Sequence, residues 1–291
     1  MKLLTFLEDK TPILGIKTEK GVINLLEAAK YFNLSIPLTM SEAIEGGEEA
    51  LSLLKKIADD CEKEGVIQSE ESLVYGPCVI NPEKILCVGI NYKKHALETN
   101  TPFPSSPIIF SKFNNALSGH KNVITLPASA KSFDYEAELV IVMGKTANNV
   151  KEEEALSYVF GYANGNDFSA RDVQFSSSQW LLGKTCDGFA PLGPWIVTKD
   201  EVTDPDNLTI ECFVNGEERQ SSNTKDMIFN CSQIISHLSR FMTLKPGDII
   251  FTGTPSGVIL GYPEADQVWL KAGDKVSVKI EKLGTLENEL K

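Results

Sequence analysis

Residues 135–144 read Tyr-Glu-Ala-Glu-Leu-Val-Ile-Val-Met-Gly, so Glu136 and Glu138 open an otherwise apolar segment. Its β-branched and aliphatic residues predict a buried strand. Side chains alternate between the two faces of a strand, so both acids project to the same side, roughly 7 Å apart at the backbone. Two carboxylates placed in this way repel each other unless a proton or a cation lies between them.

A third acid, Asp167, follows in the segment Gly-Asn-Asp-Phe-Ser-Ala-Arg-Asp. Three carboxylates that share one site fit a hard divalent cation, which takes oxygen ligands and keeps positions open for water or substrate. The alternative is that Glu136 and Glu138 form the wet face of an edge strand, which is common in antiparallel sheets. The spacing of the acids leaves both possibilities open.

The composition is that of a globular protein, with 42% hydrophobic and 23% charged residues. The net charge of −12 and the lack of clustered Lys and Arg argue against nucleic acid as a partner. No apolar run approaches the ~20 residues of a membrane span, and acidic residues come too early for a secretory signal. We therefore expect a cytoplasmic protein with no membrane partner.

Cysteine and histidine offer few metal ligands in this chain. The six cysteines form no Cys-x-x-Cys pair, and there are only three histidines. The cysteines are expected to be reduced thiols, and any metal is expected to be held by oxygen.

The order of predicted elements indicates a β-rich α+β protein. Short β-hairpins open the chain, and apolar spacing predicts a helix over residues 41–63 with a weak point at Gly46-Gly47. A polar stretch precedes Gly76-Pro77, and a domain boundary is expected there. We predict a small N-terminal cap or assembly domain over residues 1–75 and a catalytic domain over residues 76–291.

Residues 84–90 predict a buried strand that runs into a short helix carrying His95 and Glu98. Residues three apart on a helix are neighbours, so this pair could form an oriented general base. A surface ion pair is the alternative. The loop at residues 99–107 is rich in Pro and Ser, which is typical of a lid over an active site.

Two further stretches carry candidate site residues. Lys184 lies among apolar and glycine residues next to Asp187, which leaves solvent exposure and a polar pocket equally open. The strand predicted at 249–251 leads into Thr252-Gly253-Thr254-Pro255-Ser256-Gly257, whose amides and hydroxyls could approach a carboxylate or an oxyanion, or form a plain turn.

Five ordered motifs resemble the fumarylacetoacetate hydrolase family, in particular its branch with a short N-terminal domain. The resemblance covers roughly residues 80–290. The motifs are Val88 to Tyr92 with His95 and Glu98; Asp134 to Leu139; Asn166 to Asp172; Gly183-Lys184 with Gly193-Pro194; and Thr252 to Gly257.

The resemblance implies a mixed β-roll with a pseudo-barrel of strands, usually a homodimer, which binds Mg²⁺ or Mn²⁺ and acts on a small 2-oxo acid. The implied metal ligands are Glu136, Glu138 and Asp167. The implied catalytic residues are His95, Glu98 and Lys184. The implied substrate contacts are Thr254, which would meet a carboxylate, and the pocket residues Arg171 and Gln174.

The family chemistry implies hydrolytic cleavage of a C–C bond in an acylpyruvate, through a pyruvate enolate that the metal stabilises. Oxaloacetate decarboxylation and isomerisation of 2-hydroxyhepta-2,4-diene-1,7-dioate use the same machinery and stay open. The chain departs from the common family pattern at Ile90, Phe113, Cys186 and Ile259, which lie at or near the pocket and affect the expected substrate more than the chemistry.

Two other classes of protein compete with this interpretation. A metal-dependent phosphoesterase or nuclease would also use clustered acids, but Gly183-Lys184-Thr185 is only a fragment of a phosphate-binding loop, because Ser178 stands where that loop needs glycine. A catalytically silent binding or assembly paralogue is the second. The presence of both His95 and Glu98 argues for a working base.

Overall fold

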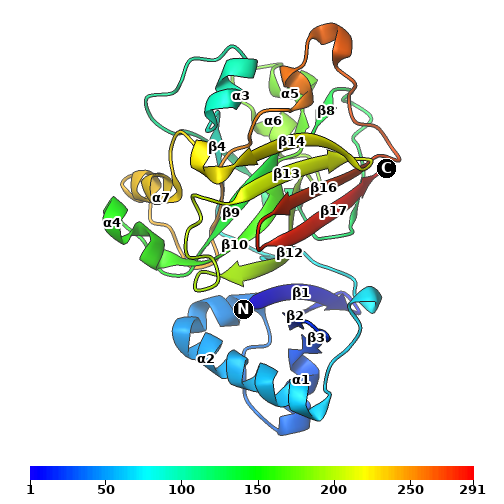
Figure 1. The fold of residues 1–291 in the computed structure, drawn as a ribbon, viewed down its shortest axis with the longest axis vertical. Helices are drawn as coiled ribbons and strands as arrows, with labels where there is room; N and C mark the ends of the chain where they lie inside the picture. The colour runs from blue at the N-terminus through cyan, green and yellow to red at the C-terminus, as the bar shows by residue number, and fades with distance from the viewer.

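The computed structural model describes residues 1–291 as a strand-rich α+β fold, as the sequence predicts (Figure 1). Its strands are β1 (Lys2–Glu8), β2 (Thr11–Thr18), β3 (Gly21–Asn24), β4 (Ile85–Gly89), β5 (Ile108–Lys112), β6 (Leu117–Ser118), β7 (Val123–Ile124), β8 (Phe133–Asp134), β9 (Ala137–Met143), β10 (Val159–Asn166), β11 (Ser169–Ala170), β12 (Ala190–Thr198), β13 (Thr209–Val214), β14 (Glu217–Asn223), β15 (Ile249–Phe251), β16 (Lys275–Ile280) and β17 (Gly284–Leu290). Its α-helices are α1 (Leu25–Phe32), α2 (Met40–Glu64), α3 (Lys93–Glu98), α4 (Glu152–Ala155), α5 (Arg171–Gln174), α6 (Leu181–Lys184) and α7 (Cys231–Ser239).

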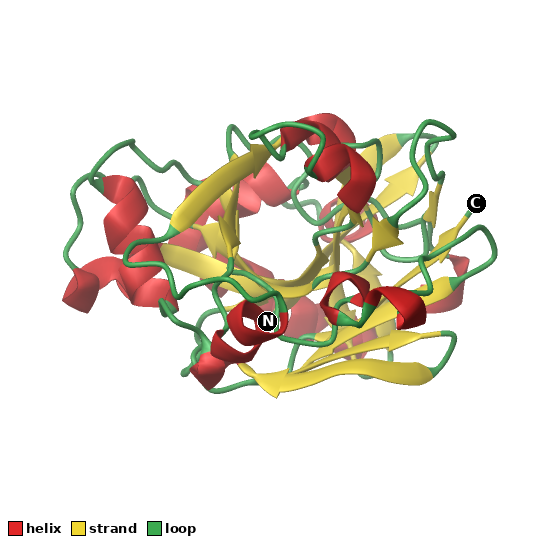
Figure 2. Ribbon diagram, turned by 90° about the horizontal axis from the view of Figure 1, so that it is seen from above, coloured by secondary structure: helices red, strands yellow, loops and turns green.

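The largest sheet runs in the order β3-β2-β1-β12-β10-β9-β15-β4-β5, with β6 added beside β12. Strand β9 lies inside this sheet, and all of its residues are buried, as the apolar run predicts. A second sheet has the order β14-β13-β16-β17-β7, and β8 pairs with β11. Figure 2 shows the strands curling around the centre of the molecule with most helices outside them, which agrees with the expected β-roll.

The N-terminal strands extend the largest sheet. Strand β1 pairs with β12 through Lys2↔Val197 and Leu3↔Ile196. Helix α2 lies at the end of the molecule far from β14 (Figure 1), and Gly47 interrupts it with φ 54° and ψ −134°. The weak point expected at Gly46-Gly47 is therefore present. The division of the chain near residue 75 stays a prediction.

One buried polar residue links the two large sheets. Asn164, in β10, donates from Nδ2 to the carbonyl oxygens of Gly193 and Leu283. Its Oδ1 accepts the Ile280 amide at 2.9 Å. An apolar residue here would leave those backbone groups without partners, so Asn164 contributes to holding β10 against the β16–β17 turn.

The structure differs from the expected elements in two places. The sequence predicts a helix that begins at Lys151 and ends before Gly161, with no strand after it, but α4 ends at Ala155 and β10 fills residues 159–166. A central strand buried on both faces needs no alternation of apolar and polar residues. Apolar residues at helical spacing predict a helix over residues 227–242, but α7 is shorter, since Asn230 and Gln233 form a capping box that starts it at Cys231. None of the helices combines the length and apolar character that crossing a bilayer requires.

Candidate active site

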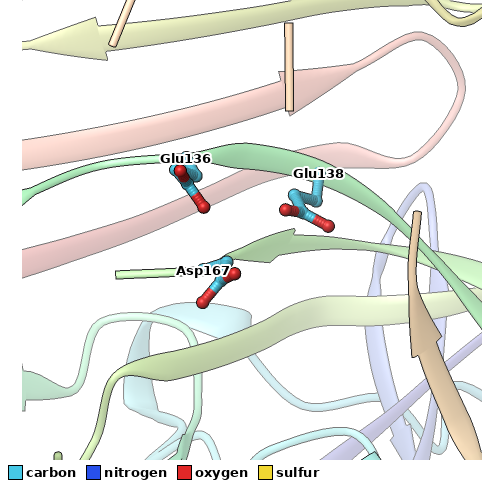
Figure 3. Close-up of side chains that lie close together, drawn as sticks. All are labelled: Glu136, Glu138 and Asp167. Atoms are coloured by element: carbon cyan, nitrogen blue, oxygen red, sulfur yellow. The ribbon is translucent and has the colours of Figure 1, made fainter. Parts of the chain in front are cut away.

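The three acids predicted as metal ligands come together in the structure. Glu136, Glu138 and Asp167 are buried, and one carboxylate oxygen from each lies within 4.8 Å of the others. Figure 3 shows the two glutamates extending from one strand toward Asp167 on the neighbouring segment. Glu136 is 5% exposed and Glu138 is 2% exposed. The wet edge strand, which the spacing left open, is therefore excluded.

The topology of the largest sheet explains this convergence. Strand β10 runs antiparallel to β9 with Asn166 opposite Ala137, so the end of β10 delivers Asp167 beside the start of β9. Strand β15 is also antiparallel to β9, and β4 is parallel to β15. The segments that follow β10, β15 and β4 thus meet at the two glutamates.

Three buried cations surround the acids. Lys184 Nζ lies 2.5 Å from Glu136 Oε2 and 2.8 Å from Asp167 Oδ2. Arg171 contacts Glu136 Oε1 at 2.6 Å, and Lys112 Nζ contacts Asp167 Oδ1 at 2.5 Å. Burial alone would raise the pKa of Glu136, but Arg171 and Lys184 outweigh burial and hold that pKa below its ordinary value. Lys184 therefore points into a polar pocket and not into solvent.

Glu138 differs from the other two acids because no cation contacts it. Its Oε2 accepts the Gly253 amide at 2.7 Å. Burial, followed by the charges of Asp167 and Glu136, raises the pKa of Glu138 well above its ordinary value. An acid in this environment is stabilised when a further cation binds beside it.

The charges and donor atoms of the cluster fit a hard divalent cation. Asp134, which accepts from Arg171 Nε at 2.9 Å, joins the three acids. When all four carboxylates are ionised, they exceed the three cations by one negative charge, which a bound cation would offset. The cavity presents carboxylate oxygens and no thiolate, a donor set suited to Mg²⁺ or Mn²⁺.

The acids line a cavity of about 260 Å³. Its apolar wall is formed by Val88, Ile90, Phe110, Phe175, Trp180 and Leu260. Gly89 allows this wall to close, because a Cβ there would lie 2.6 Å from the Trp180 ring. From the loop at 99–107, Thr99 and Thr101 line the cavity.

His95 and Glu98 form the pair that their spacing on α3 predicts. His95 Nδ1 lies 2.7 Å from Glu98 Oε1, and His95 lines the cavity. When Nδ1–H donates to the carboxylate, the lone pair of the neutral ring is on Nε2, which then is the basic nitrogen. The side chain of His95 is 8% exposed and that of Glu98 is 18% exposed, so this is not a surface ion pair.

The segment after β15 holds Glu98 in place. The Gly257 amide donates to Glu98 Oε2 at 2.8 Å. The amides of Ile259 and Leu260 donate to Asp134 at 2.8 and 3.1 Å. This segment thus connects the His95–Glu98 pair to the acid cluster through its backbone amides. It is therefore not the plain turn that the sequence left open.

The remaining predicted residues also lie at the cavity. Arg171, Gln174, Lys184 and Thr254 line it, and Gln174 Oε1 accepts from Arg171 at 3.0 Å. Three buried residues of the same network have no predicted role, namely Lys112, Asp134 and Gln220. Asp134 begins one of the quoted motifs and Lys112 precedes Phe113, but Gln220 lies in the second strand of a hairpin in the second sheet, and nothing local marks it as part of the site.

Residues 84–291 match the family model described as fumarylacetoacetate (FAA) hydrolase, C-terminal. The chain belongs to the fumarylacetoacetate hydrolase family. The "Oxaloacetate tautomerase fahd2, mitochondrial" of Xenopus laevis is 42% identical over 99% of this chain and 89% of that protein. The "Oxaloacetate tautomerase FAHD2A, mitochondrial" of Homo sapiens is 43% identical over 96% of this chain and 87% of that protein.

Solved structures of this family have the same fold. Fumarylacetoacetate hydrolase from Exiguobacterium antarcticum has a TM-score of 0.85 and 34% identity, covering 100% of this chain and 99% of that chain. Maleylpyruvate hydrolase from Sphingobium sp. SYK-6, solved with manganese(II) and pyruvate, has a TM-score of 0.79 and 28% identity, covering 100% and 98%. Family members are hydrolases and isomerases, so this chain is an enzyme of that family.

The cytoplasmic location expected from the sequence is wrong. The relatives from Xenopus laevis and Homo sapiens are named as mitochondrial proteins, which conflicts with it. The expectation rested on the lack of an apolar leader or span. Mitochondrial targeting segments are amphipathic and Arg-rich, so the absence of an apolar run does not argue against them.

Proposed function

We propose that this protein is a Mg²⁺- or Mn²⁺-dependent enzyme that interconverts the enol and keto forms of oxaloacetate. The observation that carries the proposal is that His95 and the three acids face one small cavity. A base and a divalent cation on the same side of a 2-oxo acid are the two elements that proton transfer next to its carbonyl requires.

Glu136, Glu138 and Asp167 would hold the metal. When bound, it supplies a Lewis acid that stabilises negative charge on the oxygen at C2 of the substrate. The acids also set the position of Lys184, which bridges Glu136 and Asp167. The Lys184 ammonium and the Thr254 hydroxyl then face the cavity as donors to the substrate's oxygens.

His95 would move the proton. Tautomerisation transfers one proton between C3 and the oxygen on C2, with no other atom gained or lost. The neutral Nε2 of His95 can accept that proton and return it, while Glu98 keeps the ring in the required tautomer and stabilises the imidazolium. The side chains of the apolar wall offer water no hydrogen-bond partners beside the transfer.

Oxaloacetate is favoured as substrate by the two tautomerases that share 42% and 43% of their residues with this chain over nearly its whole length. Acylpyruvate hydrolysis, which the motifs alone put first, is the second candidate. It is supported by the maleylpyruvate hydrolase solved with manganese(II) and pyruvate. In that reaction the same His95 would activate a water molecule, and the same donors would bind the pyruvate portion.

The test is a substrate panel with Mg²⁺ or Mn²⁺ supplied. Loss of the enol's ultraviolet absorbance reports tautomerisation of oxaloacetate, and released pyruvate reports decarboxylation or acylpyruvate cleavage. We expect tautomerisation to have the largest kcat/KM and to fall about 100-fold or more in His95→Gln. Faster pyruvate release from acetylpyruvate or oxaloacetate would contradict the proposal. The homodimer that the family resemblance implies stays a prediction.

A further inference from the structure

We infer that Gln220 is a positioning residue that makes the Thr254 hydroxyl a donor into the cavity. The inference rests on the proposed function, because it assigns a carboxylate ligand to Thr254. Gln220 lies in β14 of the second sheet and is 1% exposed.

A β-bulge directs Gln220 into the protein. Strand β14 pairs with β13 through Phe213↔Glu218 and Cys212↔Gln220, which leaves Arg219 as the extra residue. In a regular strand Glu218 and Gln220 would point to the same face, yet Glu218 is exposed and Gln220 is buried. The bulge breaks the alternation and turns the amide toward the acids, a common use of bulges near active sites.

The neighbours of Gln220 fix which end of its amide faces Thr254. Its Oε1 accepts the Ala137 amide at 3.0 Å, and Nε2 donates to the carbonyl oxygen of Pro255 at 2.8 Å. Ala137 offers only a donor and the Pro255 oxygen only an acceptor, so the reversed amide would lose both bonds. Nε2 is therefore the atom that lies 2.8 Å from Thr254 Oγ1, and it donates.

A hydroxyl that accepts this bond keeps its own hydrogen free. No other protein group bonds to Thr254 Oγ1, and Thr254 lines the cavity beside the acids. The free hydrogen suits an acceptor such as a carboxylate oxygen of the substrate. Gln220 also binds the Ala137 amide, between Glu136 and Glu138, so one side chain sets the substrate donor relative to the metal ligands.

The test is a double-mutant cycle between positions 220 and 254, read as oxalate affinity by calorimetry at saturating Mg²⁺. Gln220→Glu keeps an oxygen for Ala137 but replaces the NH₂ by a second acceptor, which takes the Thr254 hydrogen. Loss of a hydrogen bond to a charged group predicts that Gln220→Glu and Thr254→Val each bind oxalate about tenfold more weakly than wild type, or weaker still. Thr254→Ser keeps the hydroxyl and should bind oxalate nearly as wild type does.

The double variant distinguishes the inference from a merely structural role. If Gln220 acts through the hydroxyl, Gln220→Glu should have little further effect in the Thr254→Val background. If the two substitutions instead weaken oxalate binding independently, so that their fold-losses multiply in the double variant, the inference is overturned. An effect of the added charge or of a loosened structure would persist without the hydroxyl. Gln220→Met gives the same comparison without added charge if the Glu variant does not fold. Failure of wild-type protein to bind oxalate with Mg²⁺ would instead count against the proposed function.

Discussion

Gly261→Ala should inactivate the enzyme while leaving its fold intact. A Cβ at position 261 would lie 2.5 Å from Cδ and 2.6 Å from Oε2 of Glu98. The backbone here is anchored, because the Ile259 and Leu260 amides bind Asp134 and the Gly261 amide binds the Val258 oxygen at 3.0 Å. The atoms that must move therefore belong to the end of the Glu98 side chain, which has rotatable bonds and can turn away.

The expected loss of activity follows from the contacts that Glu98 gives up. A displaced Glu98 loses both its 2.7 Å contact with His95 and the Gly257 amide at 2.8 Å. General base catalysis contributes about 10²–10⁴ in rate, so we expect kcat for oxaloacetate tautomerisation to fall about 100-fold. The free energy of unfolding should fall by about 3 kcal/mol, because two hydrogen bonds to a charged group are lost at about 1.5 kcal/mol each, the low end of the range.

The assay is kcat from enol absorbance, paired with urea denaturation of the same samples. Glu98→Ala and the double variant Glu98→Ala/Gly261→Ala are the controls. Because the methyl group acts through Glu98, it should have no further effect once Glu98 is removed. Wild-type kcat in Gly261→Ala, or an equal loss in both backgrounds, would refute the reasoning.

Two further predictions concern stability. Burial, and then Lys121, lowers the pKa of His120 to about 4, and its Nδ1 accepts the Glu287 amide at 3.0 Å, which requires the neutral ring. The His120 ring takes up a proton near pH 6.5 in the unfolded chain but only near pH 4 in the folded protein. The free energy of unfolding should therefore fall as the pH is lowered from 6.5 to 4, and this group alone should contribute about 3 kcal/mol to the fall. Urea denaturation should show a shallower decline in His120→Gln, and an unchanged slope would contradict this. Lys112→Met should destabilise the metal-free protein by about 3–5 kcal/mol, because it leaves Asp167 Oδ1 buried without its cation. A loss below about 1 kcal/mol in the same measurement would show that Asp167 does not depend on Lys112.

Most of the site could be predicted because its residues lie at the ends of elements with clear local signals. The apolar run at 139–143 predicts β9, and its two leading acids mark the site. Helical spacing places His95 beside Glu98, and Asn215-Gly216, with φ values of 53° and 83°, forms the hairpin turn that this dipeptide predicts.

The unpredicted parts depend on contacts between segments far apart in the chain. Strand β10 contains Gly161, Asn164 and Gly165, which disfavour a strand locally and are compensated by close packing and by hydrogen bonds across the sheets. Gln220 reaches the site only because a bulge in β14 changes the direction of its side chain. Ile90 has φ 54°, a conformation that sequence patterns do not assign to a β-branched residue.

The central claim is that Glu136, Glu138 and Asp167 hold one divalent cation. The most direct measurement is anomalous diffraction from crystals of the protein grown with Mn²⁺. The account predicts one strong anomalous peak per chain, within about 2.2 Å of one carboxylate oxygen from each of the three acids. The absence of a peak at this place, with Lys184 still bridging Glu136 and Asp167, would contradict the account.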